Sequence, residues 1–201
     1  MWYNPTMATI SKPVAAPVNV LPLWRVSTAK YLQMIAAGVL GPKDRVELIE
    51  GMIVQMSPQG SRHNHFLIQL NYLFVPLWDR ATIAVQATVT IAEGAVFDPD
   101  FLLLRRRADG YKSSHPGAQD ILLVVEAAES SLSRDQKIKL PVYASAGIPE
   151  YWIADLEQET LIVHRDPQPG GYRLIETRRG DDVVSPLAAP DFSFAVRQAF
   201  D

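Results

Sequence analysis

The sequences VFDPDFLLL, residues 96–104, and ILLVVE, residues 121–126, are the two stretches that decide the fold. Each contains a continuous apolar run of strand length, Phe101 to Leu104 and Ile121 to Val125. Runs without polar alternation are typical of strands that are covered on both faces. We therefore expect both strands to lie centrally in one sheet. The polar loop between them is long enough for the second strand to return beside the first.

A carboxylate bounds each of these apolar runs. Asp100 directly precedes the first run, and Glu126 directly follows the second. Neighbouring strand ends bring the two side chains together, and carboxylates are not buried without partners. Because Mg²⁺ is usually held by one or two carboxylates, water and substrate oxygens, the pattern predicts a site for Mg²⁺, or alternatively Mn²⁺, at Asp100 and Glu126. Activation of water by such an ion is the chemistry of phosphodiester hydrolysis.

A lysine in the amphipathic stretch after Glu126 completes the predicted site. Lys137 and Lys139 are the two candidates. Two helical positions that are two residues apart differ by roughly 200° of rotation, so both lysines cannot face the site. We favour Lys139, because Tyr143 lies four residues further on the same face and supports the lysine stem. The ammonium group would orient the attacking water or offset phosphate charge.

The composition limits the class of protein. With 201 residues, 48% of them apolar, the chain fills one core and is short for two. Residues 1–22 carry four prolines and no core-forming period, so we expect a flexible arm before a single domain over residues 23–201. No apolar run approaches the roughly 20 residues that span a bilayer, and no secretory signal is recognised, which predicts a cytoplasmic protein. The absence of cysteine excludes disulfides and thiolate metal sites.

The remaining segments predict an α/β (α+β) architecture, in which helices flank a mixed sheet. We expect a helix over residues 27–35, a β-hairpin at Glu50-Gly51, a helix over residues 62–79, a half-buried strand over residues 85–91, a helix with a capping box at Ser133 and Gln136, and a C-terminal β-meander over residues 151–177. No repeat period indicates a solenoid.

The charge of the chain argues against a purely electrostatic affinity for nucleic acid. The net charge is −3, whereas phosphate binding is driven by Lys and Arg. Basic residues do cluster locally, at residues 105–107 with Lys112, at residues 134–139, and at residues 178–179. Such clusters form either a substrate groove or ordinary solvated faces.

An ordered series of motifs resembles a known family. The series comprises Val46-Glu47-Leu48-Ile49-Glu50-Gly51, Met56-Ser57-Pro58, Ser61-Arg62-His63, Pro99-Asp100, Val125-Glu126 with Ser130-Ser131, and Asp135 through Lys139-Leu140-Pro141-Val142-Tyr143-Ala144 to Gly147-Ile148-Pro149-Glu150-Tyr151-Trp152. It covers nearly everything after the arm. The chain resembles the bacterial Uma family of "putative restriction endonucleases", within the PD-(D/E)XK nuclease superfamily.

This resemblance implies a restriction-endonuclease-like fold and Mg²⁺-dependent cleavage of DNA. It implies Asp100 and Glu126 as metal ligands, Lys139 as the catalytic lysine and Glu47 as the upstream acidic residue of the site. The usual superfamily lysine two residues after the glutamate is absent, because that position is Ala128. The family resembled here supplies its lysine from the following helix. Nucleases of this kind often form homodimers, and we expect the same here.

Alternative interpretations remain for several of these residues. Asp100 after Pro99 is also typical of a strand-capping turn, and Glu126 alternatively forms an internal salt bridge with Arg134 or Lys137. Glu47 beside the hairpin suits a structural role as well. His63 and His65 either line the cleft or lie on the surface. For the whole protein, the alternative is a non-catalytic nucleic-acid-binding or protein-interaction module that retains the nuclease fold.

Overall fold

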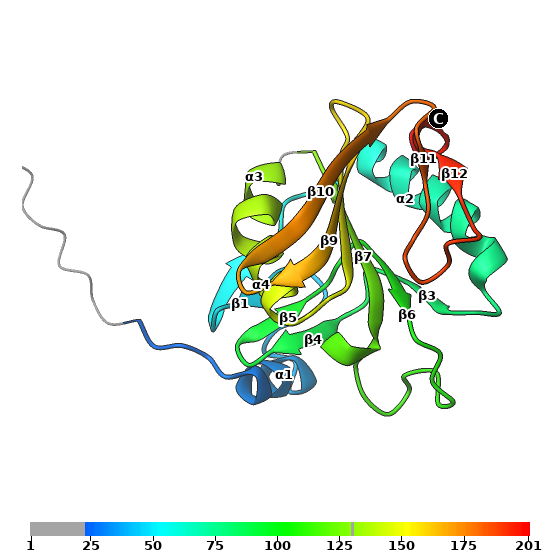
Figure 1. Ribbon diagram of the computed structural model, residues 1–201. Coiled ribbons are helices and arrows are strands. Elements are labelled where there is room, and N and C mark those ends of the chain that lie inside the picture. Colours follow the sequence, from blue (N-terminus) through cyan, green and yellow to red (C-terminus); the bar gives the residue numbers. More distant parts are fainter. Residues whose placement is uncertain (1–22, 130) are drawn as a thin grey trace, which may run out of the picture.

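A six-stranded sheet with helices on both faces forms the centre of the molecule (Figure 1). The computed structural model describes residues 23–129 and 131–201. The strands of this sheet are β3 (Thr82–Val85), β6 (Phe101–Leu104), β7 (Ile121–Ala128), β8 (Glu150–Asp155), β9 (Thr160–Gln168) and β10 (Gly171–Arg179). Their order is β10-β9-β8-β7-β6-β3, with β7 and β8 parallel and the other neighbours antiparallel. The predicted mixed sheet and its closing meander, β8 to β10, are confirmed.

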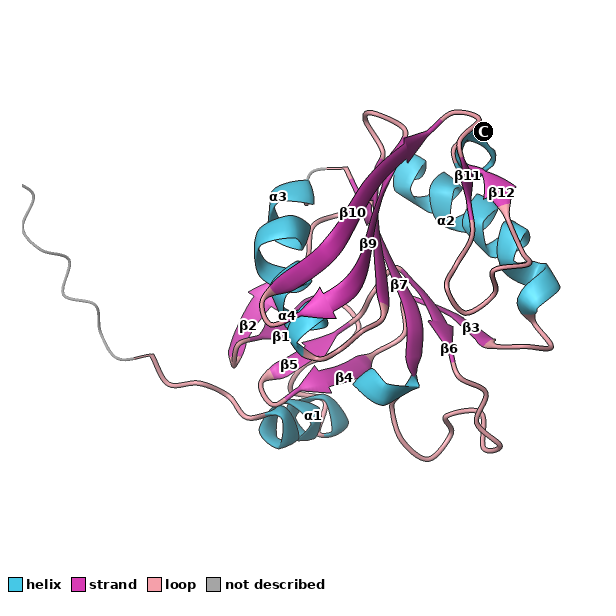
Figure 2. Ribbon diagram, in the orientation of Figure 1, coloured by secondary structure: helices cyan, strands magenta, loops and turns pink. Residues whose placement is uncertain are grey.

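A smaller sheet and several helices surround this centre (Figure 2). The smaller sheet has the order β2-β1-β5-β4, with β1 (Val46–Ile49), β2 (Met52–Gln55), β4 (Val89–Ala92) and β5 (Ala95–Phe97). A two-stranded ribbon pairs β11 (Val183–Val184) with β12 (Phe194–Ala195). The α-helices are α1 (Thr28–Ala36), α2 (Ser61–Phe74), α3 (Leu132–Arg134) and α4 (Leu140–Ser145), and a π-helical turn, Asp135–Lys139, joins α3 to α4.

The core has two layers because β7 is covered on both faces, as its unbroken apolar run predicts. On one face Val125 belongs to the same buried cluster as Phe74 of α2. On the other face Val124 belongs to the same cluster as Tyr143 of α4. Successive side chains of a strand point to opposite faces. Glu126 therefore projects toward α4, on the same side as Val124.

The hairpin between β1 and β2 forms at the predicted pair. Glu50 and Gly51 have φ angles of 48° and 75°, the left-handed conformation that two-residue hairpin turns require. A Cβ atom on Gly51 would lie 2.8 Å from Cβ of Arg25, so glycine is also required there by space. This turn fixes the register of β1 and places Glu47 opposite Val54.

The predicted strand over residues 85–91 is wrong. The structure divides it between β3, in the six-stranded sheet, and β4, in the smaller sheet. Gln86 lies at the division with a φ of 51°, and its backbone N–H donates to the carbonyl oxygen of Asp100 at 3.1 Å. The alternating pattern of residues 85–91 is continuous in sequence, but the left-handed residue turns the chain from one sheet into the other.

The predicted capping box at Ser133 is also wrong. Helix α3 begins at Leu132, and Ser131 is its N-cap residue. The Ser131 hydroxyl donates to Oδ2 of Asp135 at 2.6 Å instead of capping the backbone. Ser133 lies within the helix and is exposed. The predicted arm, residues 1–22, lies outside the described residues.

Candidate active site

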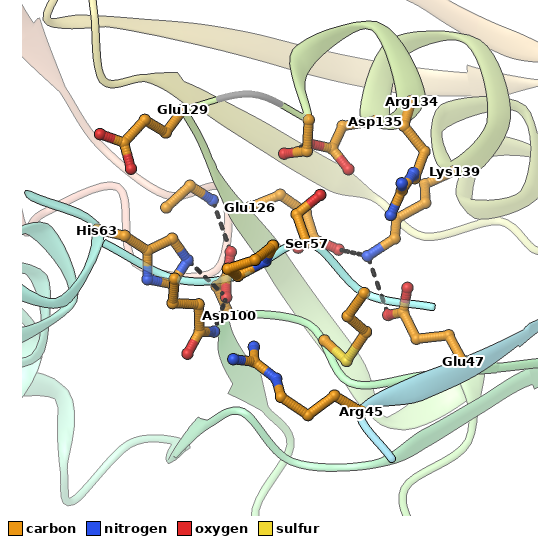
Figure 3. Close-up of a pocket in the computed structure, with 15 residues that line it drawn as sticks. Arg45, Glu47, Ser57, His63, Asp100, Glu126, Glu129, Arg134, Asp135 and Lys139 are labelled. Atoms are coloured by element: carbon orange, nitrogen blue, oxygen red, sulfur yellow. Dashed lines mark hydrogen bonds and ion pairs between the residues drawn. The ribbon is translucent and has the colours of Figure 1, made fainter. Parts of the chain in front are cut away.

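A small polar cavity of about 50 Å³ lies where the two larger sheets meet the start of α2 and the π-helical turn (Figure 3). Its lining residues come from segments far apart in sequence and are mostly charged. The charged ones are Arg45, Glu47, Asp100, Glu126, Glu129, Arg134, Asp135 and Lys139. Asp100, Glu126, Lys139 and Glu47, the four residues that the sequence nominated, all line this cavity.

Asp100 is held by its position just before β6. Phe101 pairs with Val125 of the antiparallel strand β7, so Asp100 lies beside the end of β7. Its Oδ2 accepts the backbone N–H of Ala127 at 2.9 Å, and Oδ1 lies 3.0 Å from Nε2 of His63. The carboxylate is thus fixed in direction by a backbone donor and an imidazole.

Glu126 is buried within β7 and uses one of its two carboxylate oxygens. Oε1 accepts from Nζ of Lys139 at 2.9 Å and from the Tyr143 hydroxyl at 2.9 Å. None of the hydrogen bonds between described residues reaches Oε2. Burial raises the pKa of Glu126 well above its usual value, Lys139 opposes this rise, and the charges of Asp100 and Asp135 add to it. Burial and the neighbouring carboxylates therefore disfavour the charged form of Glu126, whereas Lys139 favours it.

Lys139 bridges two glutamates at the end of the π-helical turn. Its Nζ lies 2.9 Å from Oε1 of Glu126 and 3.0 Å from Oε1 of Glu47. Burial lowers the pKa of Lys139, but attraction to Glu126 and Glu47 outweighs burial and leaves the pKa raised. Lys139 is therefore an ammonium ion at neutral pH. Lys137 is exposed on the opposite side of the segment.

The π-helical turn explains how Lys139 reaches the cavity. Its closing bond runs from the N–H of Leu140 to the carbonyl of Asp135, and single π-helical turns occur frequently at functional sites. Asp135 and Lys139, at its two ends, are both buried. Ala128 is buried at the end of β7, so the chain places its ammonium group from the helix rather than from the strand.

Glu47 joins the smaller sheet to this site. It is 3% exposed, and its Oε1 accepts from Lys139 and, at 3.1 Å, from the backbone N–H of Asp98. Asp98 directly follows β5, the strand that pairs with β1. The cavity is thus built across the boundary between the two sheets, with Glu47 on one side and Glu126 on the other.

His63 belongs to the site. From the sequence, it could have lined the cleft or lain on the surface. It is 5% exposed and contacts Asp100, and its Nδ1 has no hydrogen-bond partner among the described residues. The signal for its position was present in the helical spacing, because Phe66, Leu70 and Phe74 mark the buried face of α2 that also includes His63. Asp135 was missed too, although it lies one turn before Lys139.

The alternative partners considered for Glu126 do not contact it. Arg134 lines the cavity, but its Nη1 donates to the carbonyl of Gln55 at 3.2 Å. The basic cluster at residues 105–107 is not part of the lining, and Arg107 pairs with Asp109. The positive charges of the cavity are instead Arg45, Arg134 and Lys139.

The donor set fits a divalent cation that retains water. Five carboxylates and three cationic side chains line the cavity, which leaves an excess of two negative charges. Within residues 23–129 and 131–201, no three His, Asp or Glu side chains converge closely enough to hold a metal alone. Mg²⁺ needs only one or two carboxylates because water and substrate supply the other oxygens, and a cavity of about 50 Å³ has room for an ion with a few waters.

The part of the chain that the structure describes has no helix long and apolar enough to cross a membrane. No curated protein matches the chain. Among solved structures, a protein described as a "putative nuclease belonging to DUF820" from Anabaena variabilis superposes with a TM-score of 0.70. It is 16% identical, and the match covers 87% of this chain and 97% of that chain. This likeness confirms the predicted restriction-endonuclease-like fold.

A family model described as "Putative restriction endonuclease", Uma2, matches residues 28–197. The match includes all four nominated site residues and both larger sheets. It begins at the first residue of α1 and extends into the last helical turn, Val196–Ala199. This chain therefore belongs to the Uma2 family.

Proposed function

We propose that this protein is an endonuclease that hydrolyses DNA phosphodiester bonds with Mg²⁺ or Mn²⁺. The observation that carries this proposal is the cavity in which Lys139 bridges Glu126 and Glu47 beside Asp100. The excess of carboxylate charge in that cavity supports a divalent cation, and the description of the Uma2 family supports a nuclease.

Asp100 and Glu126 would hold the ion. Both are buried, and both present carboxylate oxygens, the donors that Mg²⁺ prefers. The chemistry that Mg²⁺ supplies when bound is a lower pKa for water and neutralisation of phosphate charge. The chain fixes its ligands in advance: the backbone N–H of Ala127 orients Asp100, and the Tyr143 hydroxyl orients Glu126.

Lys139 would orient the attacking water and stabilise the negative charge of the phosphate. Its ammonium is held by Glu126 and Glu47, so it does not reorient when substrate arrives. A fixed positive charge beside the proposed metal ligands would stabilise negative charge that develops on phosphate oxygens, and its N–H groups would orient the attacking water. Burial also raises the pKa of the Tyr143 phenol, so Tyr143 remains a hydrogen-bond donor to Glu126.

The non-catalytic binding module is the less favoured function. It predicts a lysine that points to solvent and carboxylates that pair with arginines. Lys139 is instead buried against two glutamates, although it does not contact Asp100, whose imidazole partner is His63. The arrangement supports catalysis more than binding alone.

Nicking of supercoiled plasmid DNA tests the proposal. We expect cleavage with Mg²⁺ or Mn²⁺, loss of cleavage on chelation, and a decrease of about 100-fold or more for Asp100→Ala. Asp181→Ala is the matched control, because this carboxylate pairs with Arg197 on the surface, away from the cavity. Cleavage that survives both Asp100→Ala and chelation would overturn the assignment.

A further inference from the structure

A second and larger cavity of about 580 Å³ adjoins the candidate active site. The two cavities share three lining residues, Arg45, Met56 and Gln59. Its other walls come from α1, from the segment that follows α1, and from Gln86, Thr88 and Asp98. None of the roles proposed above uses it. The shared lining residues show that the large cavity lies directly beside the small one.

The cavity combines apolar walls with a few polar groups. Ile35 and Leu40 are among its apolar residues, and Ile35 is 42% exposed. Its polar groups include the amide of Gln86 and the carboxylate of Asp98. Asp98 is half-buried and forms no ion pair with any described residue. Apolar walls with a few converging polar groups are the usual composition of small-molecule sites.

The size and chemistry suit one nucleotide. Its volume lies within the roughly 300–1,000 Å³ of small-molecule pockets, which is enough for a single base and its sugar. Asp98 is an acceptor, and carboxylates accept from exocyclic amino groups of bases. The Gln86 amide both donates and accepts. The apolar side chains of Ile35 and Leu40 line the cavity and are the kind of surface that covers a base that has left its stack.

We propose that this cavity binds one unstacked nucleotide beside the scissile phosphate and favours bases with an exocyclic amino group through Asp98. The proposal rests on the proposed nuclease function and names the part of the substrate that sets its preference. Cytosine carries such an amino group, whereas thymine does not. The backbone N–H of Asp98 donates a hydrogen bond to Oε1 of Glu47. The residue proposed to contact the base therefore lies directly beside a candidate catalytic residue.

Binding measured without cleavage tests this proposal. Wild-type protein in chelator is titrated into fluorescein-labelled, single-stranded oligodeoxycytidylate or oligothymidylate of equal length, and anisotropy is recorded. We expect the cytidylate to bind about fivefold tighter or more, since a good base contact gives at least this discrimination. Asp98→Asn should remove most of the preference, because an amide presents a donor as well as an acceptor.

A second variant changes the shape of the cavity rather than its polar group. Ile35→Trp fills the space beside α1 and should weaken binding of both oligonucleotides. Leu174→Trp is the matched control, because Leu174 is 53% exposed on β10 and is not part of either cavity. The circular-dichroism melt of each variant establishes that it is folded. If Asp98→Asn does not fold, Ile35→Trp decides: unchanged binding by Ile35→Trp overturns the proposal.

The outcomes separate this inference from the nuclease assignment. A cytidylate preference that Asp98→Asn removes supports the nucleotide cavity, even if no substrate is cleaved under any condition. Equal binding of the two oligonucleotides by wild-type protein overturns it, even if Asp100-dependent nicking of plasmid is observed. A preference that persists unchanged in folded Asp98→Asn overturns it as well.

Discussion

Two buried glutamates on neighbouring strands of the sheet have opposite surroundings. Glu126 lies on β7 and Glu150 on β8, and the two strands are parallel neighbours. Their exposed fractions are 4% and 0%. Burial alone therefore does not distinguish them. Their contacts do: Glu126 faces the α4 side with Tyr143, whereas Glu150 contacts Trp152 of the layer that packs on α2.

The difference lies in how their oxygens are used. Oε1 of Glu150 accepts from Trp152 Nε1 at 2.9 Å and from Arg165 Nε at 2.7 Å, and Oε2 accepts from the N–H of Leu187 at 2.6 Å. Both oxygens are thus occupied, and Glu150 ties the C-terminal segment to the sheet. In Glu126, Oε1 accepts hydrogen bonds from both Lys139 and Tyr143, whereas Oε2 accepts none from the described residues.

The pKa values follow the same difference. Burial raises the pKa of both glutamates. Around Glu150, the Leu187 N–H and Arg165 counteract burial. Around Glu126, Lys139 counteracts burial but neighbouring carboxylates reinforce it. Glu150, whose oxygens are both satisfied, is a structural link, whereas Glu126, with one oxygen unused among other acids, is the residue that we propose as a metal ligand.

The largest expected effect contrasts the two glutamates in activity. Glu126→Gln should reduce metal-dependent DNA nicking by about 100-fold or more, because it removes the charge of a proposed metal ligand. Glu150→Gln makes the same chemical change outside the cavity and should retain wild-type nicking per folded molecule. Plasmid nicking rates, normalised to the folded fraction from circular dichroism, check both. Equal losses in the two variants would contradict the functional distinction.

The second-largest expected effect concerns Lys139, the ammonium partner of Glu126. Lys139→Met leaves Glu126 and Glu47 buried without their ammonium partner, which should lower the free energy of unfolding by about 3 kcal/mol at pH 8. The loss should be smaller at pH 5, because the raised pKa of Glu126 favours protonation of its carboxyl, which removes its uncompensated charge. Urea unfolding followed by circular dichroism at both pH values measures it. Lys137→Met, at an exposed position, is the control, and equal stability of the two variants would refute the pairing.

Glu150→Gln should have a smaller effect on stability, of about 2 kcal/mol, because Arg165 loses a charged hydrogen-bond partner while the amide still accepts from Leu187. Glu176→Gln offers the same change at a surface ion pair with Arg178 and should leave the unfolding midpoint unchanged. Thermal and urea unfolding compare the two. A stable Glu150→Gln protein would show that Glu150 does not tie the C-terminal segment to the sheet.

The smallest expected effect concerns His164, which belongs to the same aromatic cluster as Tyr143, the hydroxyl partner of Glu126. His164 stacks on Tyr151, which contacts Tyr143, and burial lowers the pKa of His164 below 6.5. The unfolded chain then binds a proton more readily than the folded one, so the stability that neutral His164 contributes is lost as pH falls below about 6.5.

Urea unfolding at several pH values measures this dependence. The difference in unfolding free energy between wild type and His164→Phe should shrink as the pH falls from 7.5 toward 5.5. His65→Phe, at an exposed position of α2, is the control for the loss of a histidine outside the core. A difference that is constant across this range would mean that His164 does not titrate with folding.

The sequence predicted the parts of this structure that depend on local pattern. Continuous apolar runs gave β6 and β7, and the turn residues Glu50-Gly51 gave the hairpin. The strand over residues 85–91 was wrong because its alternation continues through Gln86, where the chain changes sheets. Local pattern carries no information about which sheet a strand joins, since both sheets bury the same kinds of side chain.

For the candidate site, the sequence by itself determined that Asp100 and Glu126 bound two continuous apolar runs. It also favoured Lys139 over Lys137, and resemblance to a family added Glu47. Only the tertiary structure decided that Lys139 bridges Glu47 and Glu126, and that His63 contacts Asp100. The physical reason is that a strand pattern fixes which face a side chain occupies, whereas distances between residues of different sheets and helices depend on how those elements pack.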